Sequence, residues 1–133
     1  MLRFVVVLLL ASACTLPRAE AIDALKSPDA AMRAQGARSL RGFVDVAPPL
    51  LEAVRAESDP AAKREMVAAL GPTGADEAKP VIETYVIDAH GSVDRWTAGR
   101  SLVAWLLARG LMEKNAYLPQ GWPYGQPGYP PKE

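Results

Sequence analysis

Few side chains in this sequence could carry chemistry. Cys14 is the only cysteine and His90 the only histidine among 133 residues. A single cysteine excludes an intramolecular disulfide and a cysteine-based zinc site, and a single histidine excludes paired-histidine metal sites. Asp76 and Glu77 are adjacent, but they stand at the expected start of a helix, where acidic residues offset the helix dipole. With no phosphate-binding glycine loop and no hydrolase motif, the sequence predicts a non-enzymatic protein without cofactor or metal.

Cys14 fits one covalent modification. Arg3 precedes an apolar run from Phe4 to Leu10, which is followed by small residues. The run is too short to span a bilayer, and this order is typical of an export signal. The segment "ASAC" at positions 11–14 resembles the lipobox of bacterial lipoproteins, in which the cysteine becomes the lipidated first residue. Ala11 departs from that pattern, because leucine is usual there.

Two other outcomes are open for this segment. "AEA" (Ala19 to Ala21) fits an ordinary signal-peptidase site, and cleavage there would leave Ile22 first. The signal peptide is then residues 1–21 instead of 1–13, and the protein is periplasmic or secreted. The apolar run could also remain as an uncleaved anchor helix.

Composition and charge favour packed helices that bind neither DNA nor RNA. Half of the residues are hydrophobic but only 7% are aromatic, which suits close helix packing better than a β-sandwich. Fifteen basic residues balance fifteen acidic ones, so no global positive field indicates a nucleic-acid partner.

Two kinds of helix recur along the chain. The first kind, A, is clearest in "APPLLEAV" (Ala47 to Val54) and "AKPVIETY" (Ala78 to Tyr85), which superimpose at an offset of 31 residues. Pro49 and Pro80 fit the first turn of a helix, where the missing N–H costs nothing. "AIDAL" (Ala21 to Leu25) matches the same pattern, so we expect three A helices.

A second kind of helix, B, follows each A helix after a short turn with helix-capping residues. The turns are Ser27-Pro28-Asp29, Ser58-Asp59-Pro60 and Gly91-Ser92-Val93-Asp94. We expect Gly42 and Gly71-Pro72 to end the first two B helices, because glycine supplies a positive φ and proline cannot continue. The third B helix should run to Gly110.

The B helices also share an octapeptide. "RAQGARSL" begins at Arg33, and "RWTAGRSL" begins at Arg95, 62 residues later. Each contains a mid-helix glycine, Gly36 or Gly99, which costs about 1 kcal/mol relative to alanine. We interpret these glycines as positions where two backbones approach closely; drift in a marginal helix is the alternative.

These observations predict an all-α fold: a short α-solenoid of about three antiparallel helix pairs over residues 15–110. "SPDAAMRAQGARSL" and "SDPAAKREMVAALG" resemble the second helix of short HEAT-like repeats of the bacterial PBS-lyase type. Asp29, Arg33, Ala37 and Leu40 match that pattern of turn aspartate, arginine, alanine and terminal leucine. The third unit departs from it, because Asp94 is displaced and no terminal Leu-Gly follows. The resemblance implies the fold and says little about chemistry.

The repeat favours signal-peptide cleavage before Cys14 over cleavage after Ala21. Three repeats are about the minimum that bury a continuous core, and a cut after Ala21 would remove the opening turn of the first A helix. With the cut before Cys14, Thr15 could cap that helix and Pro17 could lie in its first turn. We therefore expect a membrane-anchored lipoprotein.

B helices line the concave face of HEAT-like solenoids, where partners usually dock. Applied to this chain, that resemblance singles out five candidate protein-binding residues, since arginine and tryptophan are favoured interface anchors: Arg38, Arg41, Arg64, Trp96 and Arg100. Alternatively, Arg33, Lys63 and Arg95 pair with the turn aspartates and the other residues form a solvated face.

The C-terminal segment 111–133 has a different composition. "NAYLPQGWPYGQPGYPPKE" (Asn115 to Glu133) combines prolines and glycines with four aromatic residues, which predicts an extended, disordered tail. The alternative is that its aromatic residues, Trp122, Tyr124 and Tyr129 among them, dock on a partner or fold back on the last helix.

We therefore expect a protein–protein interaction or scaffold module of the bacterial cell envelope, with another protein as its partner and an N-terminal lipid in the membrane. One alternative is an enzyme accessory subunit similar to chromophore lyases, for which a deep apolar pocket between B helices would be expected. A spacer without a specific ligand is the other alternative. A flat polar B face would favour protein binding.

Overall fold

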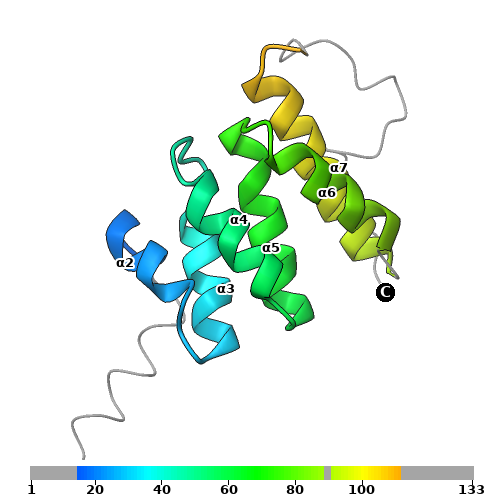
Figure 1. The fold of residues 1–133 in the computed structure, drawn as a ribbon. Helices are drawn as coiled ribbons and strands as arrows, with labels where there is room; N and C mark the ends of the chain where they lie inside the picture. The colour runs from blue at the N-terminus through cyan, green and yellow to red at the C-terminus, as the bar shows by residue number, and fades with distance from the viewer. Residues whose placement is uncertain (1–14, 89–90, 112–133) are drawn as a thin grey trace, which may run out of the picture.

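The computed structural model describes residues 15–88 and 91–111 of the chain, and these residues are helical apart from short connections (Figure 1). The elements in chain order are α2 (Arg18–Ala24), α3 (Ala30–Ser39), α4 (Ala47–Ala56), α5 (Pro60–Leu70), a 3-10 turn η1 (Gly71–Thr73), α6 (Ala78–Asp88) and α7 (Ser92–Ala108). Within these ranges, no helix combines the length and apolar character needed to cross a bilayer.

The helices form three antiparallel pairs, which confirms the predicted short solenoid. The A helices are α2, α4 and α6, and the B helices are α3, α5 and α7 (Figure 1). The B helices pack directly against one another along the stack, α3 on α5 and α5 on α7. The A helices pack mainly on B helices and hardly touch each other. The B layer is therefore the continuous spine of the fold.

Helix starts follow the predicted capping residues. Asp29 caps α3 by accepting a hydrogen bond from the N–H of Ala31 at 3.1 Å, and Asp59 caps α5 by accepting one from the N–H of Ala62 at 2.9 Å. Each satisfies a donor that the first turn leaves open. The third B helix differs, since Gly91 at its N-cap offers no side chain.

The first A helix begins later than expected. Its N-cap is Pro17 and its first residue is Arg18, so the prediction that Thr15 caps the helix and that Pro17 lies in its first turn is wrong. The cause is a tertiary contact: the N–H of Leu16 donates to the Ser39 hydroxyl at 2.9 Å. That bond draws the chain onto the end of α3 and holds residues 15–17 outside the helix.

Gly36 marks a close approach of backbones, as predicted. A Cβ at this position would lie 2.7 Å from the carbonyl oxygen of Ala21 and 2.9 Å from the Cβ of Ala24. Only glycine therefore lets α3 pack this closely on α2. Gly99 is half-buried in α7.

Gly42 and Gly71-Pro72 follow the ends of the first two B helices, as predicted, but the positive φ expected of the glycine is present only at Gly42. Gly42 has φ +93° after α3. Gly71 has φ −53°, an ordinary helical value, and the left-handed residue of that connection is Gly74. Gly71 is instead a second point of contact between B helices, because a Cβ there would lie 2.6 Å from the Ser101 hydroxyl oxygen. Proline and the 3-10 turn, rather than a positive φ, end α5.

The core runs along the interior of all three pairs. Its largest fully buried side chains are Leu40, Leu50, Met66, Leu70, Ile82, Val46 and Val67. Trp105 extends this core to the third pair: it is 5% exposed, and its indole N–H donates to the carbonyl oxygen of Ala75 at 2.7 Å. That bond satisfies the buried indole and attaches α7 to the connection before α6.

Ion pairs link each B helix to the next repeat. Arg33 of α3 contacts both carboxylate oxygens of Glu57 at 2.6 and 3.0 Å, and Arg64 of α5 contacts Asp94 of α7 at 2.6 Å. Arg33 and Arg64 are 31 residues apart, the offset of the repeat. One alternative predicted that Arg33 pairs with a turn aspartate. This prediction is wrong, because the Arg33 side chain pairs with Glu57.

Glu57 should make stability depend on pH. Its side chain is 1% exposed, and the N–H of Asp59 also donates to it at 2.8 Å. The hydrogen bonds from Arg33, opposed by burial, hold the pKa of Glu57 below its usual 4.5. A depressed acid pKa stabilises the folded state above the unfolded value, and this stabilisation is lost as pH falls through the folded pKa.

We therefore expect Glu57→Gln to destabilise the protein most near neutral pH. The difference in free energy of unfolding from wild type should begin to shrink as pH falls below the unfolded value of about 4.5, where the carboxylate of the unfolded chain becomes protonated, and it should disappear as pH falls through the lower pKa of the folded state. Urea unfolding at pH 7 and pH 3.5 measures this difference. A gap that stays constant over that range would contradict the assigned role of the charge.

Candidate functional site

The two layers of the solenoid carry opposite charge. Helices α3, α5 and α7 contain six cationic and two acidic residues, which gives +4; helices α2, α4 and α6 contain three cationic and five acidic residues, which gives −2. The neutral total hides this segregation. A partner that docks on the B layer therefore meets a positive surface, which favours acidic groups.

Two arginines near the C-terminal end of α3 share one acidic partner. Arg38 lies 3.4 Å from a carboxylate oxygen of Glu65 on α5, and Arg41 pairs with its other oxygen. The arginine side chains are 56% and 46% exposed, whereas Glu65 is 18% exposed. One carboxylate neutralises one of the two cations, so the pair keeps net positive charge and open guanidinium edges.

On α7, an arginine lies over an aromatic ring. The Arg100 guanidinium carbon is 4.6 Å from the centroid of the Trp96 ring, a cation–π distance. The stack fixes the direction of Arg100 and leaves the residue exposed. Prior fixing of the side chain lowers the entropy lost when a partner binds.

A shallow groove of about 190 Å³ connects these features. Arg41 lines one side of the groove, and Trp96 and Arg100 line the other. Its remaining lining comes from small or short side chains: Ala68, Pro72, Thr97, Ser101 and Ala104. The structure therefore brings four of the five predicted B-helix residues, Arg38, Arg41, Trp96 and Arg100, to one region, which we term the basic surface.

Arg64 lies apart from the basic surface. Its guanidinium is paired with Asp94 next to Tyr85, near the N-terminal end of α7. There it connects the second and third repeats, so we do not include it in the candidate surface. Cys14, Trp122, Tyr124, Tyr129 and the loop residue His90 lie outside the described residues.

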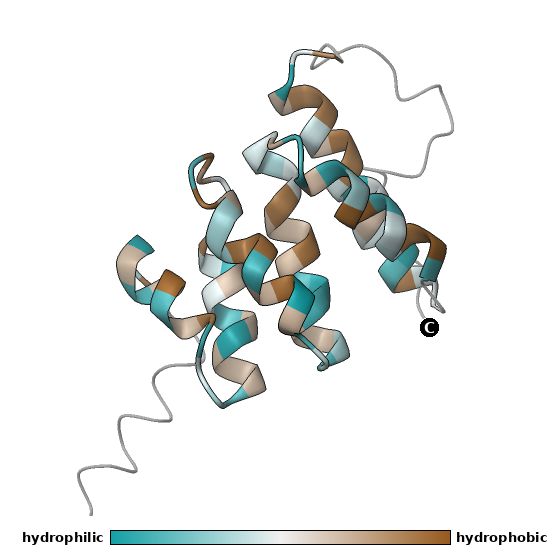
Figure 2. Ribbon diagram, in the orientation of Figure 1, coloured by the Kyte–Doolittle hydropathy of each residue, from teal (hydrophilic) through white to brown (hydrophobic). Residues whose placement is uncertain are grey.

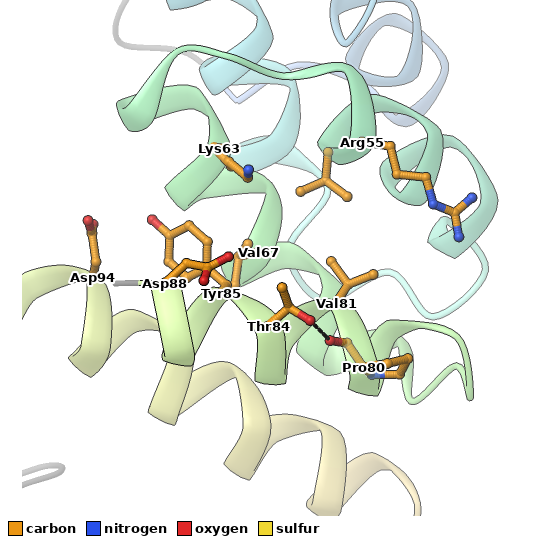
Figure 3. A pocket seen from close by; sticks show the side chains of 10 residues that line it. Arg55, Lys63, Val67, Pro80, Val81, Thr84, Tyr85, Asp88 and Asp94 are labelled. Atoms are coloured by element: carbon orange, nitrogen blue, oxygen red, sulfur yellow. Dashed lines mark hydrogen bonds between the residues drawn. The ribbon is translucent and has the colours of Figure 1, made fainter. Parts of the chain in front are cut away.

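A larger cavity, which the sequence does not predict, lies between the A helices. It has a volume of about 420 Å³ and is lined by residues of α4, α5 and α6, including Val54, Val67, Val81 and Tyr85 (Figure 3). Figure 3 shows the Tyr85 ring beside Val67, with Asp88 and Asp94 near its outer side. Burial and the Asp94 carboxylate raise the pKa of Tyr85 to about 12, so its phenol is neutral at physiological pH.

A similar cavity separates the first two A helices. It has a volume of about 350 Å³ and is lined by α2 and α4, with Pro49, Ala53 and Glu57 on one wall. Residues 31 positions later, Pro80, Thr84 and Asp88, line the larger cavity. Both cavities exist because neighbouring A helices hardly touch. Both cavities are grooves that the repeat architecture produces between neighbouring A helices, and they do not form a single specialised pocket.

A deep apolar pocket between B helices would favour the accessory-subunit alternative, and a flat polar B face would favour protein binding. The groove that includes residues of B helices α5 and α7 has a volume of about 190 Å³ and a mixed polar and apolar lining, and it is below the size of typical small-molecule sites. The cavity of about 420 Å³ beside α6 is within that size range, and Lys63 and Val67 of α5 and Asp94 of α7 contribute to its lining.

Comparison with known proteins agrees with the architecture. The family model of HEAT repeats matches residues 18–103, from the start of α2 into α7. No curated protein and no solved structure gives a significant match to the chain. The match covers most of the chain and all three helix pairs, and the chain therefore belongs to the HEAT-repeat family.

Proposed function

We propose that this protein is a non-enzymatic interaction module of a bacterial cell envelope, and that its basic surface binds an acidic segment of another protein. HEAT repeats generally mediate protein–protein interaction or scaffolding. Within the family, Asp29, Arg33, Ala37 and Leu40 favour the short PBS-lyase type. The observation that carries the proposal is the segregation of charge, with +4 on the B helices and −2 on the A helices.

The arginine side chains of the basic surface are suited to binding carboxylate groups. Arginine forms paired, charge-assisted hydrogen bonds with a carboxylate, and Arg41 and Arg100 line opposite sides of one groove. Glu65 already holds Arg38 and Arg41 together across two helices. A partner's aspartate or glutamate would enter beside Arg41 and Arg100, while Trp96 would supply apolar contact area.

Attachment to the membrane through a lipidated Cys14 is part of the proposal. Leu16, two residues after Cys14, already contacts the end of α3 through Ser39. Ala21 is completely buried. Cleavage before Cys14 keeps both of these contacts, whereas cleavage after Ala21 removes both. The architecture thus supports the choice that the lipobox resemblance suggests.

Anchoring is tested by the replacement of Cys14 with serine in the full chain. We expect Cys14→Ser to move the protein from the membrane fraction to the soluble or secreted fraction, because serine cannot accept the thioether-linked lipid. A wild-type chain from membranes whose intact mass still includes residues 1–13 would contradict lipid anchoring and would indicate the uncleaved apolar segment instead.

Docking is tested by photo-cross-linking in intact cells of the native host. A benzoylphenylalanine that replaces Trp96 reports on the basic surface, and one that replaces Glu83, exposed on α6, reports on the A layer. We expect a specific adduct from position 96. The double variant Arg38→Glu/Arg100→Glu should reduce its yield about tenfold, a loss of about 1.4 kcal/mol in affinity.

A matched charge reversal provides the control. Arg55 is an exposed arginine on A helix α4, and Arg55→Glu changes the net charge by −2, so it is compared with the single reversal Arg100→Glu, which makes the same change. The adduct at position 96 should persist in Arg55→Glu. If Arg55→Glu reduces the yield equally, the effect comes from net charge and the docking surface is wrong. If neither reversal matters, the alternative of a spacer without a ligand gains support.

A further inference from the structure

We infer that the loop Gly42–Asp45 between α3 and α4 contacts lipid headgroups and acyl chains at the base of the anchor. We term these four residues the apolar loop. This inference rests on the proposed anchoring, which orients the solenoid: one end of the helix stack must face the bilayer. Contacts of the described residues determine which end that is.

The chain enters the fold beside the apolar loop. Arg18, the first residue of α2, forms two hydrogen bonds to the Asp45 carboxylate at 2.6 and 3.3 Å. Leu16 is bonded through its N–H to Ser39, four residues before Phe43. Leu16 is two positions after Cys14, and covalent geometry limits that reach to about 7 Å. A lipid on Cys14 therefore brings this end of the stack to the membrane surface.

The apolar loop exposes the kind of side chains that insert into an interface. Phe43 is 38% exposed and Val44 is 69% exposed. Figure 2 shows brown, hydrophobic segments beside teal, hydrophilic ones in the connection between α3 and α4, at the edge of the fold. Gly42 turns the chain outward with φ +93°, and nothing lies within 4 Å of the position a Cβ would occupy there. Phe43 and Val44 can therefore enter a membrane interface without the loss of any buried contact.

Cations flank the two apolar residues. Arg18 and Arg41 lie on either side of the loop, with side chains 43% and 46% exposed. Both are paired with carboxylates, yet their long side chains remain open to solvent. Phospholipid phosphates attract such cations, and apolar residues between them can enter the interface. A single lipid-modified residue and a protein contact next to it would together hold the domain in one orientation.

The opposite end of the stack supplies a matched control. Ile87, near the C-terminal end of α6, is 81% exposed. Because A helices run antiparallel to B helices, this residue lies at the end of the helices away from the apolar loop (Figure 1). It is as apolar as Val44 and even more exposed, but it should stay in water. Exposure alone therefore cannot produce a difference between the two positions.

The test uses the full chain purified from membranes and reconstituted into phosphatidylethanolamine/phosphatidylglycerol vesicles. Val44→Cys and Ile87→Cys each introduce one thiol for an environment-sensitive fluorophore. Neither substitution removes a buried side chain. Lipidated Cys14 has no free thiol, so the wild-type chain must not label, and intact mass verifies the lipid. Vesicles with brominated acyl chains then quench any fluorophore that reaches the hydrocarbon boundary.

We expect a severalfold higher, blue-shifted emission at position 44 that brominated lipid quenches, and water-like, unquenched emission at position 87. Water-like emission at both positions in a lipidated chain would overturn the lipid contact while leaving the anchoring intact. A chain whose mass begins at Ile22, and which does not associate with vesicles, would overturn the anchoring and the lipid contact together.

Discussion

Replacing Gly71 by alanine is expected to destabilise the protein by about 3 kcal/mol, because the new methyl group would overlap the backbone of α7. It would lie 2.6 Å from the Ser101 hydroxyl oxygen and 2.8 Å from the Ser101 carbonyl carbon, with the carbonyl oxygen closer still. Ser101 cannot move aside easily, since its hydroxyl donates to the Val67 carbonyl oxygen at 2.5 Å. Separation of α5 and α7 is the only relief, and it opens the core.

The backbone conformation makes the sign of this effect unambiguous. Gly71 has helical φ and ψ values, so alanine gains intrinsic helix propensity of at most about 1 kcal/mol, which cannot offset the overlap. Gly42→Ala is the control: it meets no atom within 4 Å but has φ +93°, and a cost of about 1 kcal/mol is expected from conformation alone. Denaturant unfolding of both variants measures the difference. Equal stability of Gly71→Ala and wild type would contradict the described packing.

A chain that begins at Ile22 is expected to be less stable than one that begins at Thr15 by about 2–4 kcal/mol, from lost apolar burial offset by regained chain entropy. The truncation removes Leu16, which packs against the core, and the buried Ala21. It leaves three of the seven residues of α2, too few for a helix that packs on α3.

A third chain, of intermediate length, is compared with the chains that begin at Thr15 and Ile22. A chain that begins at Arg18 keeps α2 and Ala21 but loses Leu16 and its bond to Ser39. Its free energy of unfolding should lie between those of the other two chains, closer to the longer one. If the chain that begins at Ile22 matches the longest in stability, α2 contributes nothing, and the architectural argument for cleavage before Cys14 fails.

The repeat could be predicted from the sequence because its signals are local. Proline in the first turns of α4 and α6, and the aspartate caps of α3 and α5, act within a few residues of their own positions. Gly71 could not be assigned in this way. A glycine before a proline reads as a helix end, and only the crossing of α5 with α7 reveals that its missing side chain makes room for Ser101.

The basic surface was predictable for a similar reason. Exposed residues of a helix follow from its periodicity, so Arg38 and Arg100 could be placed on the B face from the sequence. Ion-pair partners were less predictable, as the pairing of Arg33 with Glu57 and of Arg64 with Asp94 shows. The cavities beside α4 depend on how far neighbouring A helices stand apart. The distance between neighbouring A helices follows from how the B helices stack on one another, and no single segment of the sequence encodes that stacking.

The proposed anchor, basic surface and apolar loop define one arrangement. The apolar loop would face the bilayer, and the basic surface on α3, α5 and α7 would be held at a constant height above it. A partner that carries an acidic segment near the membrane would then meet Arg41 and Arg100 without a search through the whole compartment, because tethering raises its effective concentration.

The central claim is that a complete unit of three helix pairs is held at a membrane by its own Cys14, and intact mass spectrometry of the protein from native membranes tests it most directly. We expect a mature chain that begins at Cys14 and carries a covalent lipid adduct, with α2 whole. A chain that begins at Ile22 without an adduct would contradict the claim, because the protein would then lack its anchor and the first turn of its first helix.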